Sequence, residues 1–193
     1  LEKEPEHIRK MYGLDDAKCK HFAAQCITAR RMVERGVRFI QIYSGGMENQ
    51  RSWDGHNDSL GNHTQFAGET DKPIAALLQD LAQRGLLDET LIIWGGEFGR
   101  LPLAQKSKKP GRDHNPHAFT YWLAGGGVKG GVSYGETDEI GHKAAVNKAH
   151  VNDLHATILH LMGMDHEKLT YRYNGRDFRL TDVGGEVIKQ VLA

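Results

Sequence analysis

This sequence has few cysteines, no excess of either charge and no long apolar run. Each of these absences argues against one class of protein or one kind of bond. Lys plus Arg equal Asp plus Glu at 25 each, so composition gives no argument for a nucleic-acid partner or an anionic membrane surface. No apolar stretch approaches the roughly 20 residues of a membrane span. The two cysteines, Cys19 and Cys26, fall on one predicted helix about 10 Å apart, too far for a disulfide, and are expected to be buried thiols.

Glycine and histidine are what the sequence has in excess, with 23 and 11 residues that gather in predicted loops. The length suits a single domain, 1–193, with a sizeable core. Apolar periodicity, capping residues and glycine stops divide the chain into elements. The predicted helices begin at residue 15 or 16, 71, and 152 or 153, and end near 35, 84 and 163; the predicted strands are 37–43, 91–94 and 119–124. The tail from 169 to 193 predicts two short strands and a terminal helix.

The order of these elements predicts an α/β fold with a mostly parallel sheet and helices on both faces, because a helix joining two strands is the crossover of a parallel sheet. Loops of more than about 20 residues are unusual in a compact domain and are usually functional or disordered. Two such loops leave the carboxyl ends of predicted strands, where open α/β sheets bind their ligands. Because these loops carry Asp, Glu and His residues, the pattern predicts a site at that edge of the sheet.

Five side chains in these loops are of metal-binding types: Asp54, His56, Glu97, His114 and His117. Imidazole and carboxylate are ligands of zinc, manganese and non-haem iron. Two adjacent strands would deliver all five to one edge of the sheet. The alternative is that they are surface residues of polar loops. For any single histidine this alternative is favoured, whereas the five residues together favour a metal site.

Arg100 and Arg112 border the same loop, and both are candidates to bind an anionic substrate. A guanidinium binds phosphate or sulfate through two parallel hydrogen bonds. The alternative is a solvated loop that turns at Pro110–Gly111. The three lysines of this loop, Lys106, Lys108 and Lys109, fit that alternative better.

Two further motifs carry no function. Gly125–Gly130 satisfies G-x-G-x-x-G, but a dinucleotide site needs a helix to begin there, and Gly131–Gly135 predicts none. Cys26–Arg30 comes near the C-x-P-x-R signature of sulfatases, but Thr28 replaces the proline and Cys26 lies on the apolar stripe of a helix. Cys26 is therefore interpreted as a core residue.

Several short motifs together resemble those of one family. They are Trp53–His56, Arg84–Asp88, Glu97–Arg100, Gly111–His114, Asn152–Leu159 and Leu161–Gly163. The chain resembles the sulfatase-like family called domain of unknown function 1501, which is related to the alkaline phosphatase superfamily. The resemblance runs from about Pro5 to the end and covers what looks like the C-terminal part of a larger sulfatase-like domain.

The resemblance implies a doubly wound α/β core, alkaline phosphatase/sulfatase-like, and metal-assisted hydrolysis of a phosphate or sulfate ester. The expected metal ligands are Asp54, His56, Glu97 and His114; Arg100 and Arg112 are expected to bind the anionic group, and His117 to act as general acid. The nucleophile would precede Leu1. Where the superfamily has an Asp-His pair for a second metal, this chain has Glu97-Phe98.

The expected function is therefore a metal-dependent hydrolase of sulfate or phosphate esters. Its cofactor would be a divalent metal ion, zinc, manganese or calcium, and its partner a small anionic ester. The alternative is a non-catalytic sulfatase-like domain that serves as a binding or interaction module, which Phe98 favours. The resemblance implies a periplasmic or exported protein, and a cytoplasmic location is left open. The family's first strand would precede Leu1, and a sheet without that strand would expose an edge that could pair with a second copy, so an oligomer is also left open.

Overall fold

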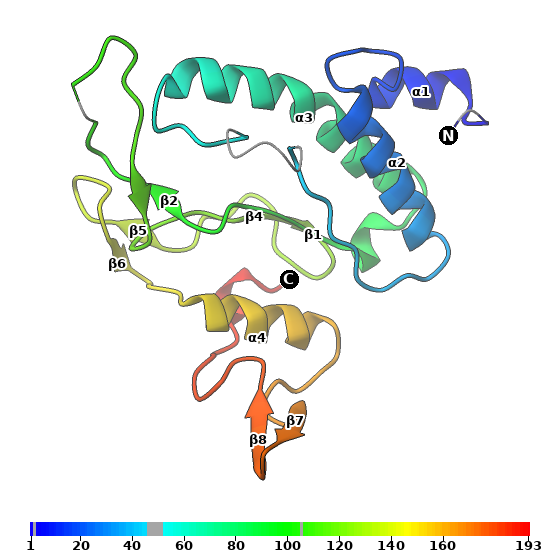
Figure 1. The fold of residues 1–193 in the computed structure, drawn as a ribbon. Helices are drawn as coiled ribbons and strands as arrows, with labels where there is room; N and C mark the ends of the chain where they lie inside the picture. Colours follow the sequence, from blue (N-terminus) through cyan, green and yellow to red (C-terminus); the bar gives the residue numbers. More distant parts are fainter. Residues whose placement is uncertain (2, 46–51, 105) are drawn as a thin grey trace. The chain divides into compact units, whose positions relative to one another are not determined.

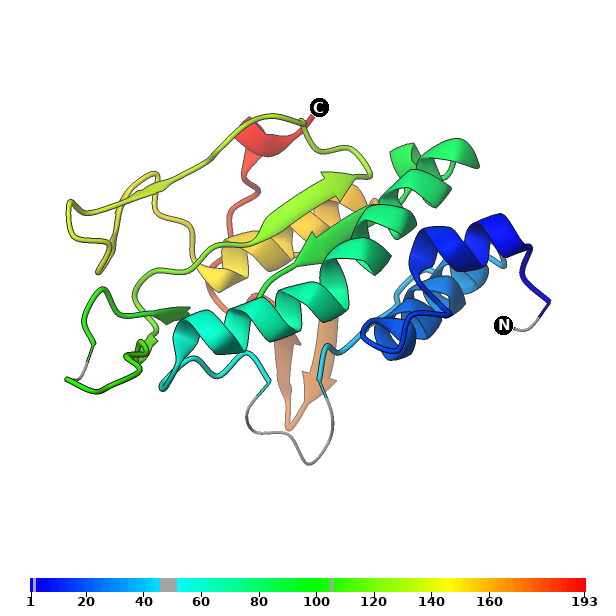
Figure 2. The same ribbon diagram turned by 90° about the horizontal axis from the view of Figure 1, so that it is seen from above.

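The computed structural model describes residues 1, 3–45, 52–104 and 106–193, and the chain divides into two compact units. Between the predicted strand 37–43 and the helix predicted to begin at 71, the sequence predicts a loop, and its residues 46–51 lie outside the described residues. The first unit comprises Leu1–Thr90 and Leu103–His114, and the second comprises Leu91–Pro102 and Asn115–Ala193. Three α-helices build the described part of the first unit, while short strands and one α-helix build that of the second (Figures 1 and 2).

The core of the first unit lies between helices α1 (Glu6–Tyr12), α2 (Lys20–Val33) and α3 (Ser59–Gln83), which pack against one another. Helix α1 ends at Gly13, whose φ of 75° is a left-handed conformation that favours glycine. The large apolar residues buried in this unit are Ile8, Tyr12, Leu14, Phe22, Ile27, Phe66, Leu77 and Leu81. Burying each such side chain contributes about 1.5–3 kcal/mol before the loss of entropy is counted.

Helix α3 begins at Ser59, well before the start predicted at Asp71. A buried stripe extends upstream of Pro73 through Thr70 and Phe66, with the spacing of a helix face. Thr70 Oγ1 donates to the Phe66 carbonyl at 2.9 Å, in the turn just before the one in which Pro73 cannot donate to the backbone. Proline therefore lies within this helix, not in its first turn, because the flanking turns are anchored in the core.

A buried ionic network joins the helices of the first unit, and no sequence motif indicates it. Arg30 of α2 is only 4% exposed and its guanidinium contacts three carboxylates: Glu4 at 2.9 Å, Glu34 at 2.9 Å and Asp80 of α3 at 3.0 Å. The buried Tyr12 hydroxyl of α1 donates to Asp80 at 3.0 Å. Because each buried charge has an opposite partner, the network stabilises one packing of the three helices.

Glu4 makes the stability of this unit depend on pH. Burial alone would raise the pKa of its carboxyl, but hydrogen bonds from Arg31 at 2.6 Å and Arg30 at 2.9 Å outweigh burial and hold the pKa below the ordinary 4.5. A pKa lower in the folded than in the unfolded state contributes stability above the unfolded pKa, and this is lost as pH falls through the folded value. Glu4→Gln is expected to flatten the acid side of the stability profile, measured by urea unfolding across pH. The exposed Glu6→Gln should keep the wild-type slope; equal slopes for Glu4→Gln and wild type would contradict the account.

Three strand pairs that the structure describes in the second unit are antiparallel. Strand β1 (Leu91–Trp94) pairs with β4 (Trp122–Gly125), with Leu91 opposite Gly125 and Trp94 opposite Trp122. The other pairs are β5 (Glu136–Thr137) with β6 (Ala144–Val146) and β7 (Thr170–Tyr173) with β8 (Arg176–Arg179). The remaining elements are the 3₁₀-helices η1 (Leu87–Glu89) and η2 (Lys189–Val191), strands β2 (Gly99–Arg100) and β3 (His114–Asn115), and helix α4 (Val151–Leu161).

Helix α4 lies across one face of the β1–β4 pair, as both views show (Figures 1 and 2). His150 caps its first turn: the ring accepts from the Asn152 N–H, and the Asp153 carboxylate accepts from the His150 N–H at 2.7 Å. A Cβ on Gly127 would come within 2.8 Å of Leu161 in α4, so the glycine permits this close packing.

The predicted mostly parallel sheet with helices on both faces is wrong. The sheets that the structure describes have two strands each, and the β1–β4 pair is antiparallel. Residues 37–43, predicted as a strand, belong to no strand, and Phe39 is 65% exposed. The physical reason is that apolar alternation marks which side chains share a face, whereas the partner and direction of a strand depend on contacts distant in sequence. None of the helices that the structure describes is long and apolar enough to cross a membrane.

Candidate metal centre

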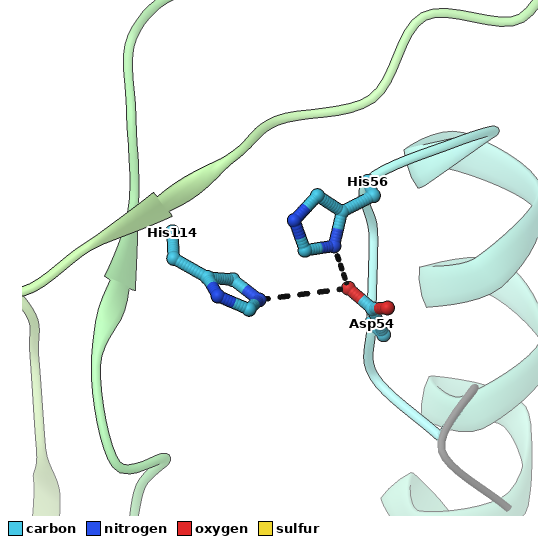
Figure 3. Close-up of side chains that lie close together, drawn as sticks. All are labelled: Asp54, His56 and His114. Carbon is cyan, nitrogen blue, oxygen red and sulfur yellow. Dashed lines mark hydrogen bonds and ion pairs between the residues drawn. The ribbon is translucent and has the colours of Figure 1, made fainter.

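Asp54, His56 and His114 converge in the first unit (Figure 3). Each offers one ligand atom, and these three atoms lie within 4.8 Å of one another. Asp54 and His56 come from the loop before α3, and His114 opens β3. Since nearly sixty residues separate the two segments, folding and not sequence proximity assembles the cluster.

Backbone hydrogen bonds hold these two segments side by side. The Arg112 N–H donates to the Gly55 carbonyl at 2.8 Å, and Asn57 forms an antiparallel bridge with Pro110. Gly55 follows Asp54, and Arg112 nearly adjoins His114, so the pairing brings the ligand-bearing residues to the same place. The position of the histidines therefore depends on backbone geometry as well as on their own side chains.

Asp58 joins both segments to the start of α3. Its side chain caps the helix by accepting from the Gly61 N–H, and it forms an ion pair with Lys109 at 2.7 Å. The bond from Lys109, followed by that from Gly61, holds the pKa of the Asp58 carboxyl below its usual value. The Asp58 N–H also donates to the Lys109 carbonyl at 3.1 Å. The loop before α3 is thus fixed at the helix end nearest the histidine cluster.

Gly111 permits the closest approach between the two segments. A Cβ at this position would lie 1.8 Å from the His56 carbonyl oxygen and 2.2 Å from that of Gly55. Both neighbours are backbone atoms, which cannot rotate aside as a flexible side chain can. Any residue other than glycine must therefore separate the segments that carry the cluster.

Gly111→Ala is expected to lower the free energy of unfolding by about 1–3 kcal/mol, the usual range for forced overpacking, and to weaken cation binding by displacing His56. Urea unfolding and calorimetric titration with zinc measure the two effects. The matched control is Gly130→Ala, where an added Cβ meets nothing within 4 Å. If the two substitutions gave equal stability and affinity, the close approach at Gly111 would not support the site.

His56 lies between two carboxylates. Its Nδ1 contacts Asp54 Oδ1, and its Nε2 lies 2.9 Å from Asp113 Oδ1. The hydrogen bond with Asp54, then that with Asp113, raises the pKa of His56 above its ordinary value. Bonds from the His114 backbone N–H and from His56 lower the pKa of Asp113. The region thus concentrates negative charge around one imidazole, which favours a cation.

The second imidazole faces the same carboxylate oxygen. His114 Nε2 lies 3.8 Å from Asp54 Oδ1, and the ring centroids of His114 and His56 are 4.2 Å apart in an edge-to-face arrangement. Figure 3 shows both rings directed toward Asp54. Asp54 Oδ1 is therefore the atom around which the cluster is built.

Two imidazoles and one carboxylate fit a transition metal. Catalytic zinc sites use three such ligands and leave a fourth position for water or substrate. Ligand atoms around tetrahedral zinc lie about 3.4 Å apart, given bonds of about 2.0–2.2 Å, so small side-chain rotations from the observed separations suffice. Calcium prefers six to eight oxygen ligands and fits this donor set less well. Zinc and manganese are therefore the better candidates.

The structure places Glu97, Arg100 and His117 in the second unit, outside the three-residue cluster. The Arg100 guanidinium lies 5.9 Å over the Phe98 ring, a cation–π geometry. The His117 N–H donates to Asn115 Oδ1 at 3.0 Å. The roles assigned to these three residues stay predictions.

Arg112 and Asp113 belong to the loop that carries His114. Arg112 Nη1 donates to the Gly111 carbonyl at 2.9 Å, and its predicted role toward an anion stays a prediction. Sequence reasoning gave Asp113 no role, although it lies in the Gly111–His114 motif. The sequence did contain one indication of its role, because Asp113 is a carboxylate directly before the candidate ligand His114.

The fold and the cluster define an α+β chain of short strand pairs with a candidate Asp–His–His metal centre. Residues 1–192 match the family described as "Protein of unknown function (DUF1501)", and the chain belongs to this family. No curated protein and no solved structure matches the chain. Because the family description names no activity, the relation to sulfatases and to the alkaline phosphatase superfamily stays a prediction.

Proposed function

We propose that this protein is a metal-dependent hydrolase of sulfate or phosphate esters. The observation that carries the proposal is the convergence of Asp54, His56 and His114, with ligand atoms within 4.8 Å of one another. The resemblance of Glu97–Arg100 and Gly111–His114 to sulfatase-like motifs supports the class of substrate. Family membership alone supports neither point.

The proposed cofactor is zinc or manganese, and it would be held by Asp54, His56 and His114. A bound divalent cation polarises an ester oxygen and stabilises the negative charge that develops there. The protein's own part is to hold two imidazoles and a carboxylate in fixed positions. Arg112, on the loop before His114, is proposed to bind the anionic group of the substrate.

The test is hydrolysis of p-nitrophenyl sulfate and p-nitrophenyl phosphate by protein loaded with zinc or manganese, beside the same protein treated with chelator. The proposal expects release of nitrophenol that chelator abolishes and added metal restores. His114→Ala should lack this activity at equal protein concentration. Loaded protein that binds metal stoichiometrically but hydrolyses neither class of ester would contradict the hydrolase.

A non-catalytic binding module is the second candidate, and Phe98 favours it. Phenylalanine cannot coordinate a metal, and here its ring lies beneath the Arg100 guanidinium. The chain thus lacks at this position the imidazole that the superfamily uses for a second metal. Metal binding without ester hydrolysis would support this candidate, with the cation in a structural role.

A further inference from the structure

We propose that Asp113 is the positioning residue of this site: its carboxylate holds the proton of His56 on Nε2 and leaves Nδ1 as the nitrogen that binds the metal. The inference rests on the proposed metal site. Asp113 does not itself bind the cation, and the ligand atom of His56 is Nδ1.

The two ring nitrogens of His56 face in different directions. Nδ1 faces Asp54 Oδ1, the oxygen that His114 Nε2 also approaches at 3.8 Å. Nε2, on the other side of the ring from Asp54, faces Asp113 Oδ1 at 2.9 Å. The side of the ring that points into the candidate metal centre is therefore the Nδ1 side.

The chemistry of the neutral ring then assigns the proton. A neutral imidazole has one N–H donor and one nitrogen with a lone pair, and only the latter coordinates a metal. An ionised carboxylate accepts hydrogen bonds and donates none. Once Asp54 is occupied by a cation, Asp113 is the carboxylate left to accept the ring proton. The N–H must then be on Nε2, and Nδ1 is free to coordinate.

Asp113 is itself held in place. The same Oδ1 accepts from the His114 backbone N–H at 2.7 Å, so one atom contacts both histidine-bearing segments. Gly111, two residues earlier, lies against the His56 backbone. The carboxylate is thus anchored on the segment opposite His56, which suits it to orient that ring. Removing such an orienting partner typically weakens metal binding about 10–100-fold.

The experiment combines nitrogen NMR of histidine-labelled protein, with saturating zinc in mildly alkaline buffer so that a cation occupies Asp54, with calorimetric titration by zinc. Wild type is expected to show His56 with its proton on Nε2. Asp113→Ala should lose this preference and bind zinc about 10–100-fold more weakly. Asp113→Asn keeps a side-chain oxygen that accepts from Nε2, so it should retain the tautomer and lose less affinity. The control is Asp177→Ala, because Asp177 is 52% exposed and Asp113 is 56% exposed; it should change neither readout.

Distinct results separate the possible failures. A proton on Nδ1 in the wild type, or an unchanged tautomer and affinity in Asp113→Ala, would overturn the role of Asp113. Loss of zinc binding as complete as in His114→Ala, without a tautomer change, would make Asp113 a ligand and would also overturn it. If wild type binds no cation but the tautomer of His56 still changes in Asp113→Ala, the result contradicts the metal site. The same result supports the role of Asp113 in orienting His56. If Asp113→Ala does not fold, the wild-type tautomer and Asp113→Asn decide the question.

Discussion

Asp80→Ala is expected to lower the free energy of unfolding by about 3–5 kcal/mol, the range for removing one partner of a buried ion pair. The Asp80 side chain is 2% exposed and contacts Arg30, itself 4% exposed, at 3.0 Å. It also accepts from the buried Tyr12 hydroxyl at 3.0 Å and from Arg84 at 2.7 Å. Alanine leaves the buried Arg30 and Tyr12 donors without the carboxylate that they contact, so the loss exceeds that of a surface ion pair.

Urea unfolding of both proteins measures this loss directly. The matched control is Asp71→Ala, the same change at an exposed position of the same helix, which should stay within about 0.5 kcal/mol of wild type. A cost below about 1 kcal/mol for Asp80→Ala would mean that Glu4 and Glu34 alone can neutralise Arg30. The network would then not determine how the three helices pack.

Asp54→Ala is expected to weaken zinc or manganese binding by at least about 100-fold, more than the loss of an orienting partner causes. Asp54 supplies the single anionic ligand of the cluster, and both imidazoles face its Oδ1 atom. Without it, the two imidazoles lose the oxygen that brings them together. Isothermal titration with each cation gives the two affinities, and circular dichroism shows whether the variant is folded.

Asp88→Ala is the control for this change, since Asp88 is an exposed aspartate of the same unit outside the cluster. It should bind cations as the wild type does. Equal affinities for Asp54→Ala and Asp88→Ala would show that binding, if any, occurs elsewhere. Asp54 would then be an acceptor for His56 and no ligand.

Local patterns predicted individual elements well. Strand β1 has the predicted bounds, Leu91–Trp94, and the tail contains the two predicted strands and a terminal 3₁₀-helix. Helix α2 lies within the predicted 15–35 segment, ending at Val33. Each of these depends on periodicity, capping residues or a glycine stop within a short window, which a sequence displays directly.

Pairing of strands could not be predicted in the same way. The alternation at 37–43 is a property of that segment alone, whereas a strand also needs a hydrogen-bonded partner. The helical stripe through Phe66 and Thr70 was present in the sequence, but the Gly, Asn, Asp and His residues before Asp71 favoured a loop, and Pro73 favoured a helix start at Asp71. Tertiary packing overrides such local preferences, since burial of Phe66 outweighs the cost of glycine in a helix.

The Asp54, His56 and His114 cluster was predicted in part, but the place in the fold from which it was predicted is wrong. Residue chemistry and the resemblance indicated Asp54, His56 and His114 as ligands, and the structure brings these three together. The prediction placed them at an edge of a parallel sheet, whereas they lie in the loop before α3 and at the first residue of β3, in segments joined by backbone hydrogen bonds. Asp113 was missed because its role depends on which nitrogen of His56 it faces, a property of geometry alone.

Metal content by mass spectrometry tests the central claim most directly, on wild type, His114→Ala and His155→Ala purified without chelator. His155 is an exposed histidine of α4 and serves as the matched control. The account predicts stoichiometric zinc or manganese in the wild type and in His155→Ala, and its loss in His114→Ala. Metal absent from all three proteins, or retained in His114→Ala, would contradict the assignment of Asp54, His56 and His114 as a metal centre.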